Sequence, residues 1–341
     1  MVANEIFKFA YENDASDIHF NTGEPVAFRI NGKITKFPAF STVYSKEDIF
    51  GIVSFIHSSI PPVRRPSDID TVLNGVLDFS CNYKLDNDIV IRCRGSLFSS
   101  IDGLSLSVRL FPGNIPSLFD LKCPKGVLKL LTEYTHGLVI LAGPTGSGKS
   151  TTLAAMINHL NSSENKRIIT IEDPVEYIHR SQKCIITHRE VGKNCNSYYE
   201  GFKQVLREDP DIILIGEIRD AETMKLAMEA AESGHLVLST LHSSDVIESI
   251  NRIIGMFPSS HSEVVSNQLS VSLAGIIAQK LVKAKNGGRV AAYEILINNP
   301  TVANIIKCCD MRHMGDYMRP ELGMIKFSDS LLGLRNRKII D

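Results

Sequence analysis

Apolar residues recur with two different periods along the chain, and the change between them predicts two domains. Up to about residue 110, segments with helical spacing are mixed with segments in which apolar and polar residues alternate, as in strands. Helices are predicted at Asn4–Asn13 and Ser45–Ile56, and strands within Ser16–Phe20, Pro25–Phe37 and Gly75–Leu110. Asn31-Gly32 is a strong signal for a hairpin turn. We therefore expect a smaller α+β domain over residues 1–110, with a mostly antiparallel sheet.

Beyond a linker at residues 111–122, which is rich in proline and glycine, buried strands alternate with helical stretches. These strands are predicted at Leu138–Leu141, Ile168–Ile171, Ile212–Ile215 and Leu236–Thr240. The alternation indicates a parallel sheet covered by helices, the α/β class. From Val246 to the end the pattern is helical, apart from a strand at Arg289–Leu296. The second domain is thus predicted over 123–341, with a helical C-terminal subregion over about 246–341.

Composition and charge exclude little beyond a membrane-spanning protein. Of 341 residues, 43% are hydrophobic and 22% are charged, as in ordinary soluble domains. The formal net charge of -1 gives no overall attraction to nucleic acid or to an acidic membrane. No stretch approaches the roughly 20 apolar residues that span a bilayer, and the N-terminus lacks the features of a secretory signal. Because the seven cysteines form no Cys-x-x-Cys pair, we expect reduced thiols and a cytoplasmic location.

A phosphate-binding loop follows the first strand of the second domain. Gly143 and Gly148 enclose four residues and precede Lys149 and Ser150, which is the Walker A spacing. The glycines let backbone N–H groups surround phosphate oxygens, Lys149 reaches the β- and γ-phosphates, and Ser150 offers a hydroxyl to Mg²⁺. The predicted ATP-binding residues are Gly143, Thr145, Gly146, Ser147, Gly148, Lys149, Ser150 and Thr151. The strand before the motif and the helix after it argue against a chance match in a glycine-rich turn.

Acidic residues follow two other strands of the same sheet. Glu217 follows Ile212–Ile215, as in a Walker B strand, although Gly216 stands where an aspartate often holds Mg²⁺. Glu172 and Asp173 lie at the end of a third strand. Hydrolysis needs a carboxylate that orients or deprotonates a water in line with the γ-phosphate, and such groups lie at strand ends beside the P-loop. The alternative is that these acids cap the helices that follow.

A histidine follows the fourth strand. The pattern Thr240-x-His242 is typical of a sensor, a group that detects whether the γ-phosphate is present. A single histidine is as often structural, so this pattern alone leaves both roles open.

Four sequence boxes together resemble those of the ATPases of type II secretion, type IV pili and type IV secretion. GPTGSGKSTTLAAMI, TIEDPVEY, LREDPDIILIGEIRDAET and AAESGHLVLSTLHSSD are similar to the Walker A, Asp, Walker B and His boxes of that superfamily. Ala15–His19, Arg29–Lys33 and Gly288–Glu294 match as well. Within the superfamily the chain looks most like the PilT-like retraction ATPases of type IV pili. The resemblance implies a RecA-like ATPase domain preceded by a PAS-like domain, a homohexameric ring, and nucleotide bound between the two domains.

The resemblance also implies roles for individual residues. Besides the phosphate-binding loop, the residues that it implicates are Glu217 and Glu172 for water and metal, His242 with His235 in the His box, Arg94 and Arg109 against the γ-phosphate, and Arg219 and Asp173 in support. Membership of the His box favours the sensor role for His242. For the two arginines of the N-terminal domain, solvated positions on strands are the alternative.

One departure from the family pattern concerns the work that the protein does. Where retraction ATPases carry an arginine in a C-terminal Ala-Ile-Arg signature, this chain has Ala303, and its tail stops at Asp341. We expect hydrolysis to survive both changes. The resemblance implies a motor at the cytoplasmic face of the inner membrane that drives pilus retraction on a platform protein and meets the membrane only through that partner. Alternatives to this role are an ATPase of a type IVB-like or type II-like secretion system, a nucleic-acid motor, a small-molecule kinase and a binding module with an inactive nucleotide site. We do not expect nucleic acid as a partner.

Overall fold

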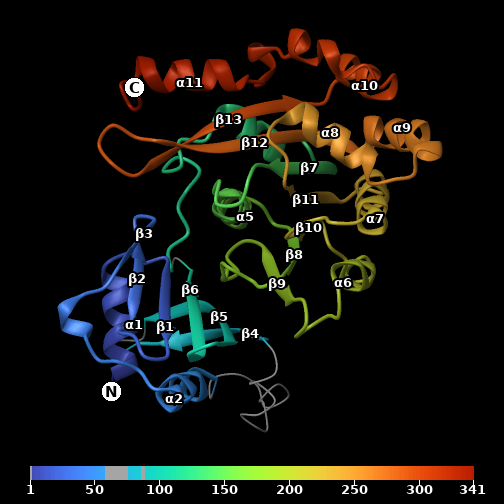
Figure 1. The fold of residues 1–341 in the computed structure, drawn as a ribbon. Coiled ribbons are helices and arrows are strands. Elements are labelled where there is room, and N and C mark those ends of the chain that lie inside the picture. Colours follow the sequence, from blue (N-terminus) through green and yellow to red (C-terminus); the bar gives the residue numbers. More distant parts are fainter. Residues whose placement is uncertain (1, 58–75, 86–88, 112) are drawn as a thin grey trace. The chain divides into compact units, whose positions relative to one another are not determined.

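The computed structural model describes residues 2–57, 76–85, 89–111 and 113–341. The chain divides into two compact units, Met1–Asn114 and Ile115–Asp341. The division falls inside the stretch expected to be a linker. Figure 1 shows the ribbon of both units, coloured along the sequence.

The first unit is an antiparallel sheet with two helices. Six strands follow the order β3-β2-β1-β6-β5-β4. Their bounds are β1 Asp17–Asn21, β2 Ala27–Ile30, β3 Lys33–Thr35, β4 Val76–Lys84, β5 Val90–Ser100 and β6 Gly103–Leu110, and the helices are α1 Val2–Glu12, α2 Lys46–His57 and a 3₁₀ turn at Pro38–Phe40. The expected helices, the hairpin and the antiparallel sheet are all found. Asn31 and Gly32 form the β2–β3 turn with φ of 51° and 80°, a conformation that favours asparagine and glycine.

The core of the first unit lies between its helices and one face of its sheet. On α1, Ile6, Phe7 and Ala10 are fully buried, as their helical spacing predicts, whereas Tyr11 is exposed. Phe7 stacks on Tyr83 of β4, with ring centroids 4.2 Å apart. The other face of the sheet is therefore free to carry polar side chains.

The second unit is built on a mixed sheet of seven strands in the order β13-β12-β7-β11-β10-β8-β9. The strands are β7 Gly137–Ala142, β8 Arg167–Glu172, β9 Ile185–Glu190, β10 Ile212–Ile215, β11 Leu236–Leu241, β12 Leu273–Lys283 and β13 Arg289–Ile297. The helices are α4 Lys125–Thr132, α5 Lys149–Ser163, α6 Tyr198–Val205, α7 Ala221–Glu232, α8 Val246–Gly255, α9 Ser262–Ser272, α10 Pro300–Lys307 and α11 Phe327–Asn336, with 3₁₀ turns at Ser259–His261, Met311–Tyr317 and Pro320–Leu322. Only the β12–β13 pair is antiparallel.

The C-terminal subregion is less helical than its sequence pattern predicts. The prediction of helix over 246–341 apart from one strand is wrong for residues 273–283, which form β12 between β7 and β13. The first seven residues of β12 are all buried, so no alternation marks it as a strand. The edge strand β9 was also missed. In Figure 1, α10 and α11 lie beside the β12–β13 hairpin.

The parallel part of the sheet positions the functional loops. β7, β8, β10 and β11 are flanked by other strands on both sides, and nearly all of their residues are buried. In parallel strands the carboxyl ends meet at one edge, and ligands bind there in open α/β sheets. The Walker A loop, Glu172, Glu217 and His242 each follow or end one of these strands. The fold therefore gathers them at one edge.

Candidate active site

The P-loop between β7 and α5 needs glycine at two positions. Gly148 is the N-cap of α5 and has a φ of 89°, in the left-handed region. Gly143 has a φ of 153°, and a Cβ there would lie 2.5 Å from the carbonyl oxygen of Gln279. Because α5 starts directly at Lys149, its first N–H groups are directed at the loop, as an anion site requires.

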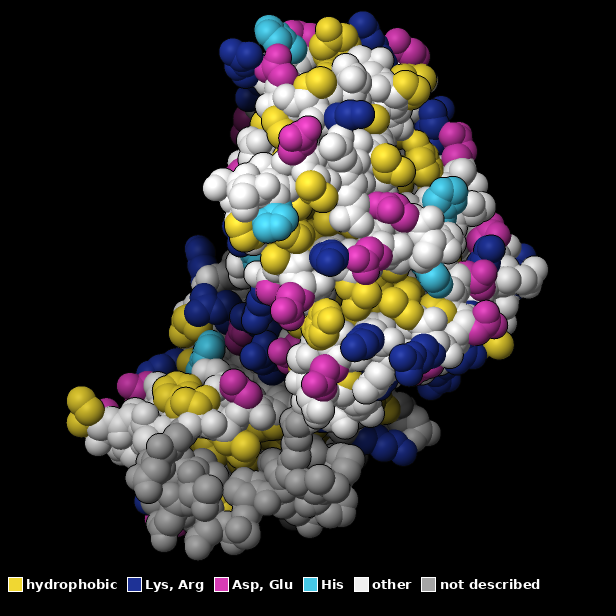
Figure 2. Space-filling view, turned by 90° about the vertical axis from the view of Figure 1, so that its right-hand side faces the viewer, with side chains coloured by type: hydrophobic (Ala, Val, Ile, Leu, Met, Phe, Trp, Pro, Cys, Tyr) yellow, Lys and Arg dark blue, Asp and Glu magenta, His cyan; other side chains and the backbone are white. Residues whose placement is uncertain are grey.

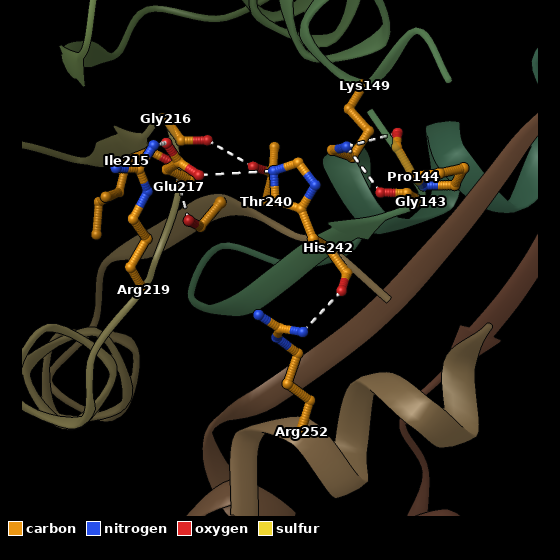
Figure 3. Close-up of polar contacts among 11 residues, drawn as sticks. Gly143, Pro144, Lys149, Ile215, Gly216, Glu217, Arg219, Thr240, His242 and Arg252 are labelled. Carbon is orange, nitrogen blue, oxygen red and sulfur yellow. Dashed lines mark hydrogen bonds and ion pairs between the residues drawn. The ribbon is translucent and has the colours of Figure 1, made fainter. Parts of the chain in front are cut away.

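Lys149 lies inside this loop (Figure 3). Its ammonium donates to the carbonyl oxygens of Gly143 at 2.8 Å and Pro144 at 3.0 Å. Burial lowers the pKa of Lys149, while the carboxylates of Glu217 and Glu176 oppose that shift. The cation is thus held among carbonyl groups where phosphate oxygens would lie. Of the other predicted ligands, Thr145, Gly146 and Ser150 are exposed around the loop.

Gln279 of β12 fastens the P-loop to the sheet and was missed by the sequence reading. Its side-chain amide donates to the carbonyl oxygen of Ser147 at 2.7 Å, and its carbonyl oxygen accepts from the Thr152 hydroxyl at 2.8 Å. Gln279 is 2% exposed, so both bonds lie in the interior. Thr151, the last predicted ligand, contacts the Tyr177 hydroxyl at 3.0 Å. No local signal identifies Gln279, because its partners lie more than a hundred residues earlier in the chain.

Glu217 lies between a cation and a histidine (Figure 3). One of its carboxylate oxygens pairs with the Arg219 guanidinium, and the other lies 3.6 Å from Nε2 of His242. The side chain of Glu217 is 17% exposed. The pKa of His242 is lowered, first by burial and then by the positive charge of Lys149, although Glu217 opposes this. His242 is therefore a neutral imidazole near pH 7, which hydrogen-bonds without adding charge.

The backbone around Glu217 and His242 is fixed by polar side chains. The Thr240 hydroxyl donates to the carbonyl of Gly216 at 2.7 Å, which ties the end of β11 to that of β10. Arg252 of α8 donates to the carbonyl of His242 at 3.0 Å. The residues of the Walker B and His boxes are thus brought together, as their positions at neighbouring strand ends predict.

Glu172 at the end of β8 has its own polar neighbours. Nδ1 of His188, on the adjacent strand β9, lies 2.9 Å from the Thr170 hydroxyl and 3.8 Å from a Glu172 oxygen. Nε2 of His188 lies 3.0 Å from the backbone nitrogen of His179, so Nδ1 is the ring nitrogen that faces Thr170 and Glu172. The backbone of Glu172 also lies beside the loop after β10, because a Cβ on Gly216 would lie 3.4 Å from the Cα of Glu172.

The acids named above are not the caps of the following helices. The N-cap of α7 is Asp220, whose carboxylate accepts from the N–H of Thr223 at 2.8 Å. The N-cap of α6, the first helix after Glu172, is Ser197. Glu217 and Glu172 cap neither helix, and both remain available at the strand edge.

Three predicted residues are not gathered at this edge. His235 precedes β11 and bonds the carbonyl of Ala230, so the length of the strand, about 20 Å, separates it from His242. Arg94 and Arg109 belong to the first unit, on β5 and β6, where they pair directly across the two strands. Arg109 donates to Asp17 at 2.9 Å. Within the described residues Arg94 makes no ion pair or hydrogen bond.

The described residues hold no cluster of three or more metal-ligating side chains. No helix among them has the length and apolarity to cross a bilayer. Over the larger unit, the face in Figure 2 carries basic and acidic side chains interspersed, without a continuous basic stripe.

Comparison with known proteins shows the family. The family described as "Type II/IV secretion system protein" matches residues 86–324. The chain is 39% identical over 332 residues to the uncharacterized protein YggR of Escherichia coli K12, covering 97% of each chain. It is 37% identical over 307 residues to the type IV pilus retraction ATPase PilT of Pseudomonas aeruginosa, covering 90% of this chain and 86% of that protein.

A solved structure is similar in fold over nearly the whole chain. The crystal structure of a pilus retraction motor PilT with bound ADP matches with a TM-score of 0.86 at 37% identity, covering 99% of this chain and 94% of that one. The match confirms the predicted fold class, an α/β ATPase domain with a smaller α+β domain before it.

Proposed function

The chain belongs to the type II/IV secretion system protein family and is an ATPase, and from this premise we propose that it drives the retraction of a type IV pilus. The observation that supports retraction is the likeness to PilT in sequence and in fold along both units. The site supports the chemistry, because a P-loop lysine and two strand-end glutamates lie at one edge of the parallel sheet.

In this proposal the residues of the site divide the work. Lys149 and the N–H groups at the start of α5 bind the β- and γ-phosphates. Glu217 and Glu172 orient and deprotonate the attacking water, and each is a carboxylate only partly exposed to solvent. His242 reports the presence of the γ-phosphate to Glu217 by a hydrogen bond.

The site also suits Mg²⁺. Magnesium prefers oxygen ligands and is usually held by one or two protein groups together with phosphates and waters. The Ser150 hydroxyl on the first turn of α5 and the Glu217 carboxylate are oxygen donors of this kind. Bound Mg²⁺ neutralises charge on the phosphates, whereas positioning the water is left to the protein carboxylates.

The assembly proposed for this protein is a homohexameric ring on an inner-membrane platform protein. A ring would allow arginines of the first unit, Arg94 and Arg109, to reach a γ-phosphate and to lose those bonds on hydrolysis. That loss couples chemistry to movement. The second candidate is a secretion-system ATPase, which the absence of arginine at Ala303 on α10 favours.

The Glu217→Gln variant tests the proposal. The amide keeps the shape of the side chain and removes the base, so nucleotide binding should persist while turnover falls by at least about a hundredfold. A fluorescent ATP analogue measures binding, and phosphate release measures turnover. Glu263→Gln, on the first turn of α9, is a matched control.

The same variants, expressed in cells, test the biological role. A strain lacking the protein should carry surplus pili, and wild-type protein and the Glu263→Gln control, but not Glu217→Gln, should restore retraction. Wild-type turnover by Glu217→Gln would remove Glu217 from the mechanism. Normal retraction in the deletion strain, together with lost secretion, would instead establish the secretion role.

A further inference from the structure

Gly216 is confined by a neighbour and not by its backbone conformation. It follows β10, and its φ is outside the left-handed region. A Cβ on Gly216 would lie 3.0 Å from the hydroxyl oxygen of Tyr198, and 3.4 Å from the Cα of Glu172. The space that a Walker B side chain would enter at this position is therefore already bordered by a tyrosine hydroxyl.

Tyr198 is placed there by the start of α6. It is the first residue of this helix, directly after the N-cap Ser197, whose hydroxyl accepts from the N–H of Glu200. The ring packs against the core of the second unit. Because the ring is anchored and the helix is capped, the hydroxyl has a fixed position.

The hydroxyl faces the acidic groups of the site. Burial raises the pKa of Tyr198, and the carboxylates of Glu217, Asp173 and Glu172 raise it further, against an opposing effect of Arg219. The phenol is therefore protonated at any pH at which the enzyme works, so it is a neutral hydrogen-bond donor among acceptors. Within the described part of the chain it makes no hydrogen bond to another residue.

We propose that Tyr198 is a positioning residue for hydrolysis: its hydroxyl donates to the water that Glu172 and Glu217 orient toward the γ-phosphate. A free donor beside two carboxylates is the arrangement that holds a water by both its acceptor and its donor sides. The hydroxyl thereby borders the space that a Walker B side chain would enter at Gly216. The inference rests on the ATPase activity and on the glutamate roles proposed above.

The Tyr198→Phe variant tests this directly, with Tyr199→Phe as the matched control at the exposed next position. We expect kcat to fall by about three- to tenfold with KM for ATP unchanged, since one hydrogen bond in the transition state is lost. Tyr199→Phe should match the wild type in both measurements.

A double-mutant cycle with Gly216→Ala gives a measurement that does not depend on activity. The added methyl should lower the thermal stability of the wild type, because it meets the hydroxyl, and should lower that of Tyr198→Phe less. Additive losses would show that the hydroxyl does not occupy this space and would overturn the proposal. So would an unchanged kcat, or a KM for ATP that changes together with kcat, which indicates a structural role.

The outcomes for Tyr198 and for the proposed function are separable. If Glu217→Gln keeps full turnover, the glutamate roles fail whatever Tyr198→Phe does. If Glu217→Gln is inactive and Tyr198→Phe behaves like the wild type, only the inference about the hydroxyl fails.

Discussion

At the scale of single residues, burial affects the pKa of the basic side chains around the site more than neighbouring charges do. The pKa values of Lys149, His242 and His179 are all lowered, and burial is the largest cause for each. His179 is affected most, with a pKa of about 4, because its stacked neighbour His188 adds to the effect of burial. Nδ1 of His179 is buried and has no hydrogen-bond partner among the described residues. A proton on Nδ1 of His179 therefore has no acceptor among the described residues.

His179 should make the protein less stable in acid. Between pH 6.5 and about 4 the unfolded chain binds a proton at this residue and the folded protein does not, so stability is complete above pH 6.5 and falls toward pH 4. The loss from this one group is on the order of 3 kcal/mol. We expect His179→Leu to flatten the dependence of the free energy of unfolding on pH over this range, as measured by urea denaturation.

The control for this prediction is His261→Gln, in the exposed 3₁₀ turn before α9. It should leave the slope with pH as in the wild type. An equally steep slope in His179→Leu would show that other groups cause the loss of stability in acid.

At the scale of elements, β12 connects the sheet to the P-loop. It pairs with β7 in parallel and with β13 in antiparallel, and its Gln279 bonds the loop on one side and α5 on the other. The glycines of the loop leave room for the side chain of Gln279, because a Cβ on Gly148 would lie 2.8 Å from the Gln279 amide nitrogen. The conformation of the Walker A loop thus depends on a strand that follows it by more than a hundred residues.

Replacing Gln279 should loosen the P-loop. Gln279→Leu leaves the Thr152 hydroxyl and the Ser147 carbonyl without partners in the interior, at a cost of about 2 kcal/mol in the free energy of unfolding. The KM for ATP should rise by several-fold, because the loop is less ordered for phosphate. Calorimetry and steady-state kinetics measure the two effects.

Two further substitutions refine this prediction. Gln279→Glu keeps the acceptor for Thr152 and loses the donor to Ser147, so it should weaken ATP binding as well. Lys283→Ala, at the exposed end of the same strand, should change neither quantity. Wild-type KM values in both Gln279 variants would exclude the strand as a determinant of the loop.

At the scale of the whole molecule, the first unit presents a row of charges on one face of its sheet. Arg29, Asp17, Arg109 and Arg94 are paired in register across four adjacent strands. Asp17 is shared by Arg29, at 3.6 Å, and Arg109, at 2.9 Å. The carboxylate of Asp17 therefore neutralises part of the positive charge of this row. Within the described residues, the side chain of Arg94 is the cation of the row that has no ion pair.

In the proposed ring, two arginines of this row, Arg94 and Arg109, should act on hydrolysis from outside the ATPase unit. Arg94→Ala should lower kcat by about tenfold or more with nucleotide binding retained, because a charge-assisted bond to the γ-phosphate is worth at least this much. Arg109→Ala should lower kcat less, since its guanidinium is already paired with Asp17. Arg29→Ala is the control and should turn over as the wild type does. Wild-type rates of hydrolysis in both Arg94→Ala and Arg109→Ala would support the alternative, that both arginines are solvated residues on strands.

The sequence by itself determined the features that depend on neighbouring residues. The glycines of the P-loop, the acids after β8 and β10, the Asn31-Gly32 turn and the apolar strands all follow from local backbone requirements or local periodicity. The sequence also determined that one edge of the sheet carries Glu172, Glu217 and His242, because the carboxyl ends of parallel strands lie at the same edge.

Only the tertiary structure decided the features that depend on distant residues. The strand β12 has no alternation to reveal it, since both of its faces are buried over most of its length. The bonds of Gln279 to the P-loop, the position of the Tyr198 hydroxyl over Gly216 and the contact of His188 with Thr170 join separate strands and helices. The physical reason is that such contacts arise from packing and hydrogen bonding across the sheet, which residue spacing along the chain does not encode.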